Sequence, residues 1–365
     1  MSEKGKDVEK NLSLDNARKK INRIDEEVVR LLNERVATCK EIGKIKSALN
    51  MEVLDMARES QVLERVTSAS EEAPPEGIRE VYREIISMCR NIQRPTSVAY
   101  LGPAGSFSHE AAYSTFGNSS KFSPCRRIKK IFIEVDIGRC DVGVVPLENT
   151  IEGAVNETLD CFIDYPVSIT GEIQLRITLN LIVNPQVNSL SEIENIYSHP
   201  QALAQCDGYI TKYLSDKNIV VTESTARAAE HVLRDMKGAA VASKAAAELN
   251  GLKIYEAGIE DTPNNYTRFV TIHKGEPPKV GVKSSAIFAL EHVPGSLAAV
   301  LSEFAKQSVN ITMVLSRPMP TRSWEYYFYL DFEGSLSDKN IVLALKEVRR
   351  KTRFLRILGS YSKLQ

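Results

Sequence analysis

The sequence predicts a multidomain protein with an all-α region first, an α/β region in the middle and an α+β ferredoxin-like region at the end. Three hydrophobic patterns predict this order: a heptad stripe, then short β-branched runs alternating with amphipathic segments, then a βαββαβ succession of elements. A chain of 365 residues is also too long for one typical core. We expect domains over residues 12–94, 97–274 and 284–362.

Composition favours a small molecule as the partner. Lys plus Arg and Asp plus Glu both total 47, so no overall field would attract nucleic acid or an anionic membrane. The six cysteines form no C-x-x-C pair, which argues against zinc spacing and a dense disulfide framework. No run of 18 apolar residues occurs, and the first eleven residues are a polar mix of Lys, Glu and Asp without an apolar core. We expect a cytoplasmic protein with reduced thiols, no metal and no membrane span.

One long helix is expected from Leu14, because apolar residues recur there at alternating steps of three and four as far as Leu49. Its length would be roughly 54 Å, more than the width of so small a domain, so it should pack against a second copy in a homodimer or tetramer. Asp55 can cap a second helix that ends near Ser68, and a third helix is expected over residues 76–93, after a Pro-Pro break.

Basic residues interrupt the heptad stripe. Arg35 and Lys46 are eleven positions apart, which on a helix places them on one side, about 16 Å from each other. Their long side chains could converge on one small anion. Arg18 lies about 25 Å from Arg35 on the same straight helix, so only an antiparallel partner could bring it to the same molecule. Solvated charges on a coiled-coil flank are the alternative, and periodicity alone favours neither.

Residues 12–93 resemble the all-helical chorismate mutases. The resemblance runs through the motifs L-x-x-A-R-K-K-I-x-x-I-D, L-L-N-E-R, I-G-K-I-K and V-L-D-x-x-R-E and through the terminal Gln93. It implies that Arg35, Arg58 and, from a partner chain, Arg18 would hold the two carboxylates of chorismate. The site would then be shared between two chains.

The same resemblance implies which residues contact the ether oxygen and the ring hydroxyl of chorismate. Lys46 and Gln93 would hydrogen-bond the ether oxygen, and Glu59 with Asp55 would contact the hydroxyl and its surroundings. A Claisen rearrangement needs no base or nucleophile; it needs a folded substrate and donors for the charge that grows on the ether oxygen. Cys89 stands where the family commonly places Ser, and its thiol is a weaker donor.

In the central region, polar residues end most of the predicted strands. Strands are expected over residues 98–101, 142–145, 179–183, 219–222, 239–242 and 269–272. They should form a mainly parallel sheet covered by helices, and a helix that begins at a strand end offers free N–H groups to a carboxylate. Open α/β sheets usually bind ligands at this edge. Ordinary helix capping is the alternative for each single residue.

Residues 97–273 resemble the prephenate dehydratases. Five segments carry the resemblance: G-P-A-G-S-F-S from Gly102, P-L-E-N-T from Pro146, S-H-P-Q from Ser198, E-S-T-A from Glu223 and N-Y-T-R-F from Asn265. The resemblance implies two α/β subdomains, arranged as in type II periplasmic binding proteins, with the substrate in the cleft between them. The residues expected to line that cleft are Ser106, Glu148, Asn149, Thr150, His199, Ser224 and Thr225.

The T-R-F triplet implies the chemistry of this region. By resemblance, Thr267 would be the catalytic residue and Arg268 would bind the substrate. Prephenate loses CO2 and hydroxide as its ring becomes aromatic, so the departing oxygen needs a proton. A free alcohol is a poor acid, and the sequence leaves open how Thr267 is activated. His199 is a second candidate acid, although a His before Pro at a strand end is as often structural.

The last region has the order strand, helix, strand, strand, helix, strand between residues 285 and 359. It resembles ACT domains, which pair through their sheets and bind amino acids at the interface. The resemblance predicts L-phenylalanine as the effector, with its carboxylate at the start of the first helix. Leu315 stands where the family usually has Glu, and a dimerisation module without a ligand is the alternative. The expected effector residues are Gly295, Ser296, Leu297, Ala298, Ser316 and Arg317.

Together these resemblances predict a bifunctional enzyme of phenylalanine biosynthesis. It would convert chorismate to prephenate and prephenate to phenylpyruvate, under feedback by L-phenylalanine. No metal or organic cofactor is implied. Two alternatives stay open: a dehydratase whose helical domain serves only for dimerisation, and a non-catalytic ligand-sensing protein.

Overall fold

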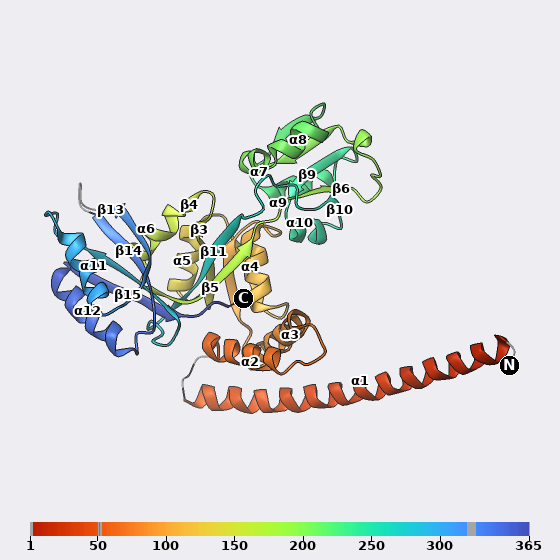
Figure 1. Cartoon of the computed structure of the whole chain (residues 1–365), viewed down its shortest axis with the longest axis horizontal. Helices are drawn as coiled ribbons and strands as arrows, with labels where there is room; N and C mark the ends of the chain where they lie inside the picture. The colour runs from red at the N-terminus through yellow and green to blue at the C-terminus, as the bar shows by residue number, and fades with distance from the viewer. Residues whose placement is uncertain (1–2, 50, 52, 320–325, 365) are drawn as a thin grey trace.

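The computed structural model describes residues 3–49, 51, 53–319 and 326–364, and Figure 1 shows how these residues are arranged. The helical region consists of α1 (Glu3–Ala48), α2 (Met56–Ser68) and α3 (Pro75–Gln93). α1 is one continuous helix, and its N-terminal part extends well beyond α2 and α3 (Figure 1). The three predicted helices are thus confirmed, although α1 begins at Glu3 and not at the expected Leu14.

Local sequence explains where the second and third helices begin. Oδ1 of Asp55 accepts the backbone N–H of Arg58 at 2.9 Å and so caps α2, as expected. α3 begins with Pro75, whose missing N–H would have no helical partner at that position. α1 and α3 approach each other closely at Gly43, where a Cβ would lie only 3.0 Å from Cγ of Gln93.

The first α/β lobe is built on a six-stranded sheet. Its elements are β1 (Ser97–Leu101), α4 (Phe107–Phe116), β2 (Lys121–Cys125), α5 (Ile128–Asp136), β3 (Val142–Asn149), β4 (Gly153–Ala154), α6 (Asn156–Asp164), β5 (Val167–Arg176) and, from later in the chain, β11 (Tyr266–Lys274). The strand order is β2-β1-β3-β11-β5, with β4 beside β3. β11 therefore lies between two strands that precede it by about a hundred residues.

The second α/β lobe has a five-stranded sheet in the order β10-β6-β9-β7-β8. Its strands are β6 (Asn180–Val183), β7 (Asn195–Ser198), β8 (Asn218–Val221), β9 (Gly238–Ala242) and β10 (Lys253–Glu256). Its helices are α7 (Pro200–Gln205), α8 (Asp207–Tyr213), α9 (Thr225–Val232) and α10 (Lys244–Leu249), with a short 3-10 turn η1 (Leu190–Glu192). Figure 1 shows this lobe standing apart from the first, joined to it by the segments before β6 and after β10.

The prediction of mainly parallel sheets is wrong, because both sheets are mixed. β1 runs parallel to β2 and β3, whereas β11 runs antiparallel to both β3 and β5. In the second lobe, β7 is parallel to β8 and β9, but β6 is antiparallel to β9 and β10. The cause is the double crossing between lobes: the chain leaves after β5 and returns in the opposite direction through β11.

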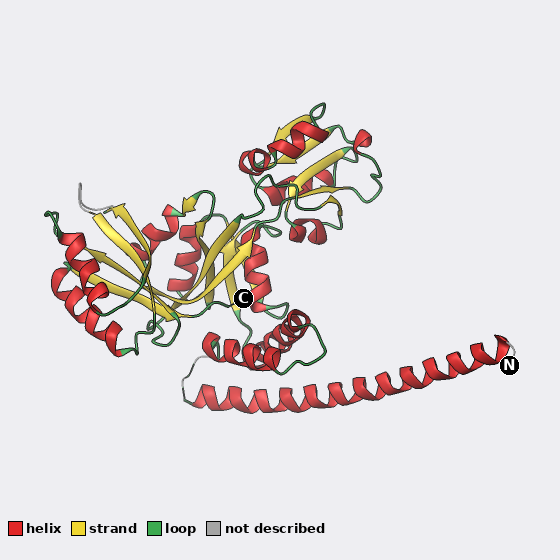
Figure 2. Ribbon diagram, viewed as in Figure 1, coloured by secondary structure: helices red, strands yellow, loops and turns green. Residues whose placement is uncertain are grey.

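The C-terminal region has the predicted βαββαβ order. It comprises β12 (Lys283–Ala289), α11 (Ser296–Lys306), β13 (Ile311–Pro318), β14 (Tyr326–Glu333), α12 (Lys339–Lys351) and β15 (Phe354–Tyr361), with strand order β13-β14-β12-β15. The two helices cover its outer face (Figure 2). On the other face, Ile287 and Tyr329 share one hydrophobic core with Phe162 and Ile272 of the first lobe. The C-terminal region is therefore packed firmly onto the first lobe.

A buried charge cluster joins these two regions around Arg268, which is 8% exposed. Its guanidinium lies 2.6 Å from Glu172 of β5 and 2.6 Å from Asp331 of β14, and it donates to the hydroxyl of Tyr361 at 3.1 Å. Lys283 adds a second cation, 2.7 Å from Glu172. Burial acts to lower the pKa of Arg268. The opposing effect of its neighbours is larger, that of Asp331 first among them, and raises this pKa above its usual range. The guanidinium therefore stays charged inside the protein.

We predict that Asp331→Asn lowers the free energy of unfolding by about 3 kcal/mol, because it leaves a buried guanidinium short of one partner. Urea unfolding measures the change. The matched control is Asp160→Asn, which breaks the partly exposed pair of Asp160 with Arg317, 2.9 Å apart. That change should cost at most about 1 kcal/mol. Equal small effects of the two substitutions would contradict the importance of the buried cluster.

Candidate active sites

The helical region forms an open cavity of about 780 Å³ lined by all three helices. It gathers six of the seven residues expected for the mutase site, namely Arg35, Lys46, Asp55, Arg58, Glu59 and Gln93. They come from the C-terminal half of α1, the start of α2 and the last turn of α3, so the fold brings together positions up to 58 residues apart.

Several polar groups of this cavity are already held in place. Nη1 of Arg35 donates to Sγ of Cys89 at 2.6 Å, and Nζ of Lys46 donates to the carbonyl of Val53 at 2.9 Å. Burial, helped by the neighbouring Cys89 sulfur, raises the pKa of the Cys39 thiol to about 11, so this thiol is neutral at pH 7. The cavity is thus cationic along α1, where Arg35 and Lys46 lie beside the neutral Cys39 thiol.

Arg18, the seventh expected residue, does not reach the cavity in a single chain. Its side chain is 68% exposed and lies 3.7 Å from Asp15 on the same helix. The apolar stripe around it is also uncovered, since Leu14, Ile21 and Ile24 are each about half exposed. α1 therefore presents a hydrophobic face and a cation that the single chain leaves unused.

Sequence reasoning missed Arg90, which lines the same cavity. Its Nη1 donates to both carboxylate oxygens of Glu59, at 2.9 and 2.6 Å. A basic residue three positions before Gln93 was the only signal in the sequence, and its partner could not be read from the chain.

A second cavity, of about 320 Å³, lies between the two α/β lobes. The first lobe contributes the C-terminal ends of β1 and β3 and the start of β11, and the second contributes the starts of α7 and α9. Six of the expected residues line it: Ser106, Asn149, His199, Ser224, Thr225 and Thr267. The lining residues that the structure describes include neither Arg nor Lys.

Asn149 links the strand ends at the base of this cleft. Its Nδ2 lies within hydrogen-bond distance of Oγ1 of Thr267 at 3.0 Å and of Oδ1 of Asn265 at 2.8 Å. Asn265, 1% exposed, donates to Oε1 of Gln205 in the second lobe at 3.1 Å. Asn265 and Gln205 were not expected as site residues, although Asn265 stands only two positions before Thr267 in the same motif.

Two serines of the cleft use their hydroxyls to cap helices. Oγ of Ser106 donates to the carbonyl of Leu101 at 2.9 Å and accepts the N–H of His109 at 3.2 Å. Oγ of Ser224 accepts the N–H of Arg227 at 3.1 Å. A ligand would therefore meet the free N–H groups of the first turns of α4 and α9 rather than these hydroxyls.

The ring of His199 has a similar local partner. Its Nδ1 accepts the N–H of Gln201 at 3.4 Å, at the start of α7. This long hydrogen bond agrees with a structural role, yet the ring still borders the cleft.

Arg268, Glu148 and Thr150 were expected in the cleft, and the structure places them outside it. Side chains alternate along a strand, so Arg268 points to the opposite face from Thr267, and Glu148 follows it there, 4.0 Å away. Oγ1 of Thr150 donates to the carbonyl of Asn264 and accepts the N–H of Tyr266, both at 3.0 Å. In the structure these three residues make contacts that support the strands, and their expected contacts with the substrate stay a prediction.

The expected effector residues lie in two separate places. Gly295, with φ of 86°, precedes Ser296 at the start of α11, which has no side-chain cap. Arg317 instead forms two hydrogen bonds with Asp160 of α6, at 3.1 and 2.9 Å. Leu315 packs against the core shared with the first lobe, so this position serves packing in the single chain.

Among the residues that the structure describes, no helix is both long and apolar enough to cross a membrane. No cluster of three His, Cys, Asp or Glu side chains in the same part of the chain is placed to hold a metal ion.

Three known protein families match three successive parts of the chain. Residues 17–94 match the family model of chorismate mutase type II, residues 98–277 that of prephenate dehydratase, and residues 285–350 that of the ACT domain. Among solved structures, a prephenate dehydratase from Arthrobacter aurescens in complex with L-Phe is 30% identical, with a TM-score of 0.67. The match covers 74% of this chain and 90% of that one.

A second solved structure, GqqA, described as a novel type of quorum quenching acylase, is 29% identical with a TM-score of 0.67 and covers 73% of this chain and 98% of that one. The bifunctional chorismate mutase/prephenate dehydratase of Aquifex aeolicus is 43% identical over 95% of this chain and 97% of its own length. Given this similarity along both catalytic regions, the chain belongs to the bifunctional chorismate mutase/prephenate dehydratase family.

Proposed function

We propose that this chain converts chorismate to prephenate in the helical cavity and prephenate to phenylpyruvate in the cleft between the α/β lobes. The observation that carries the proposal is the contact between Asn149 Nδ2 and Oγ1 of Thr267, 3.0 Å apart at the base of the cleft. Catalytic domains over residues 12–94 and 97–274 and a regulatory domain over 284–362 would act together in the cytoplasm.

In the helical cavity, binding and orientation supply the catalysis. Arg35 and Arg58 hold the carboxylates of chorismate, and Lys46 and Gln93 donate to the ether oxygen as its bond breaks. Lys46 is held by the Val53 carbonyl before the substrate arrives, so little reorganisation is needed. Asp55 and Glu59 face the ring hydroxyl. No proton transfer is required in this rearrangement.

In the cleft, Thr267 donates its hydroxyl proton to the departing oxygen of prephenate. The C–O bond breaks to release water, the ring carboxylate leaves as CO2, and its electron pair completes the aromatic ring. The amide of Asn149 donates to Oγ1 of Thr267, which stabilises the charge that grows there and leaves the hydroxyl proton to point at the substrate. Solvent then returns a proton to Thr267.

The absence of Arg and Lys from the described lining of the cleft suits this reaction. A cation paired with the ring carboxylate would stabilise the ground state that must lose CO2. The pyruvyl carboxylate can instead be bound by the free N–H groups at the starts of α4 and α9, in which Ser106 and Ser224 hold the capping geometry. Thr225 and His199 would complete the wall of the second lobe.

Two chains assemble through α1. The uncovered apolar stripe needs a partner, and an antiparallel copy would carry its Arg18 into the cavity of this chain. The proposal is therefore at least a homodimer with shared mutase sites.

L-phenylalanine regulates the dehydratase from the C-terminal region. Its carboxylate would bind the start of α11 over residues 295–298, where no side chain caps the helix, with Ser316 and Arg317 at the interface between copies. The buried cluster offers a route to the cleft, since Asp331 holds Arg268, the residue next to Thr267. The complex of the Arthrobacter aurescens protein with L-Phe supports this ligand.

The alternatives have less support. A helical domain used only for dimerisation gives no reason for six expected polar residues to line one cavity. A protein that only senses a ligand gives no reason for the Asn149 amide to lie within hydrogen-bond distance of Thr267.

We predict that Thr267→Ala lowers dehydratase kcat by about 10² to 10⁴-fold and leaves mutase activity unchanged, because only the cleft loses its acid. Asn149→Ala should also lower it, by about tenfold or more. Thr150→Ala is the matched control from the adjacent position outside the cleft and should have a small effect. Assays with prephenate and chorismate separate the two activities. Normal phenylpyruvate formation by Thr267→Ala would remove Thr267 from the mechanism.

We predict complementation between two inactive mutase variants, Arg18→Ala and Lys46→Ala. Each homodimer should lose most activity, since a charged hydrogen bond contributes roughly 1.5–3 kcal/mol. Random co-refolding makes half the dimers mixed, and one of their two sites is intact, so about a quarter of wild-type mutase activity should return. Dehydratase activity serves as the folding control. If the mixture only averages its parents, Arg18 acts within its own chain.

We predict that L-phenylalanine binds the protein in calorimetry and lowers dehydratase turnover, because binding at the interface of the C-terminal regions shifts the lobes between two states. L-alanine, which lacks the aromatic ring, is the matched ligand. Absence of phenylalanine binding at millimolar concentration would leave the C-terminal region as a dimerisation module.

A further inference from the structure

One buried arginine touches both catalytic regions. Arg90, in the last turn of α3, is 3% exposed. One edge of its guanidinium binds both carboxylate oxygens of Glu59 in the mutase cavity, through Nη1. The other edge leaves the helical region: Nη2 donates to the carbonyl of Phe116 at 2.6 Å and to Oγ of Ser120 at 3.2 Å. Arg90 thus spans the boundary between the two catalytic regions.

The end of α4 is shaped to receive this side chain. Phe116 is the last residue of α4, so its carbonyl has no helical partner, and Gly117, with φ of 68°, turns the chain away. The ring of Phe116 lies under the guanidinium, 5.4 Å from it, in a cation–π contact. Oγ of Ser120 donates to the same carbonyl at 2.9 Å. The acceptor of Arg90 is therefore itself fixed.

Two other side chains of α3 hold the same segment. Glu84 accepts the N–H of Asn118 at 3.1 Å, and Ser87 offers its hydroxyl to the N–H of Ser119 at 3.2 Å. Glu84, Ser87 and Arg90 recur every three residues on one face of α3. The loop after α4 is thus clamped onto the helix that forms one wall of the mutase cavity.

We propose that Arg90 is a positioning residue of the mutase reaction: it holds the Glu59 carboxylate for the ring hydroxyl of chorismate, and the dehydratase region fixes Arg90 through Phe116 and Ser120. The inference rests on the proposed role of Glu59. The paired contact fixes the rotamer of Glu59, so that its carboxylate is oriented before the substrate arrives. The mutase site of this chain is then completed by its own dehydratase lobe.

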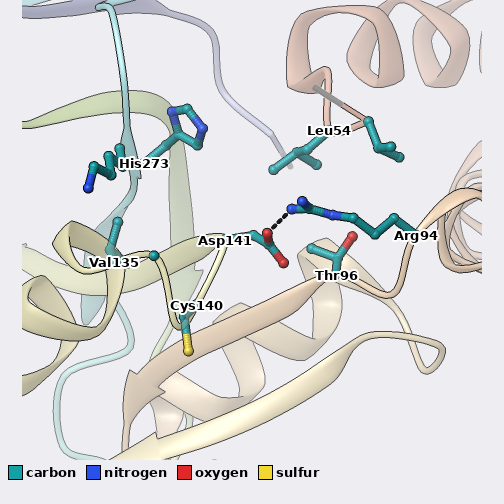
Figure 3. Close-up of a pocket in the computed structure, with 10 residues that line it drawn as sticks. Leu54, Arg94, Thr96, Val135, Cys140, Asp141 and His273 are labelled. Carbon is teal, nitrogen blue, oxygen red and sulfur yellow. Dashed lines mark hydrogen bonds and ion pairs between the residues drawn. The ribbon is translucent and has the colours of Figure 1, made fainter. Parts of the chain in front are cut away.

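The same boundary offers a matched control one turn further along the chain. Arg94 forms an ion pair with Asp141 of the first lobe beside a cavity of about 210 Å³ (Figure 3). Figure 3 shows this pair lying between Leu54, in the loop before α2, and the first lobe. The Arg94 side chain is 64% exposed and does not border the mutase cavity. Its loss should weaken the boundary without touching Glu59.

The test is a double-mutant cycle in the full-length protein, with chorismate and prephenate as substrates. Arg90→Lys keeps the charge, but one ammonium cannot bind Glu59 and the Phe116 carbonyl in the same fork. Mutase kcat/KM should fall about 10- to 100-fold, with dehydratase kcat/KM unchanged. In a Glu59→Gln background the same change should cost less than about threefold, because its target is already lost. Arg94→Ala should leave both activities unchanged.

A second variant tests the contribution of the dehydratase region. Ser120→Ala lies outside the mutase cavity, and it should lower mutase kcat/KM about two- to fivefold while dehydratase activity stays normal. If Arg90→Lys fails to fold, Ser120→Ala still tests the inference. Wild-type mutase activity in Ser120→Ala, or additive losses in the double-mutant cycle, would overturn this inference and leave the proposed function intact. Wild-type mutase activity in Glu59→Gln would remove Glu59 from the proposed site and overturn the inference with it.

Discussion

The buried ion pair between Arg268 and Asp331 fixes the strand on which the cleft depends. β11 lies between β3 and β5, and it carries Thr267 on the face of the cleft and Arg268 on the face of the C-terminal region. Because side chains alternate along a strand, a shift by one residue would exchange these two environments. The strand therefore has one acceptable register, and the contact that anchors the C-terminal region also sets the position of the proposed acid.

Beside each proposed active site, a buried arginine forms contacts with a neighbouring region of the protein. Arg90 connects Glu59 of the mutase cavity to the end of α4, and Arg268 connects the strand of Thr267 to β14. A buried charge is costly unless its partners are in place. Each arginine is therefore stable in its buried position only when the two regions that it joins are packed together. The Arg90 contacts therefore give a physical reason for the mutase and dehydratase regions to be carried by one folded unit.

The sequence predicted what periodicity and local signals determine. The heptad stripe predicted α1, Asp55 predicted the start of α2, and the motifs predicted six of the residues that line each cavity. It could not predict the direction of β11, because that follows from a double crossing between lobes. Consecutive motif residues also look equivalent in a sequence, so Arg268 and Glu148 were expected beside Thr267, although alternation turns them away. The partners of Arg90 and Asn265 lie in other regions, and no local pattern indicates them.

The central claim is that one chain performs both reactions in succession, and it is tested most directly by giving the purified protein chorismate alone. Prephenate and phenylpyruvate are followed over time by chromatography after rapid quenching without acid, since acid converts prephenate to phenylpyruvate by itself. The account predicts that chorismate disappears, prephenate rises and then falls, and phenylpyruvate accumulates to the amount of chorismate supplied. Accumulation of prephenate without phenylpyruvate, or no consumption of chorismate by a protein that still dehydrates prephenate, would contradict it.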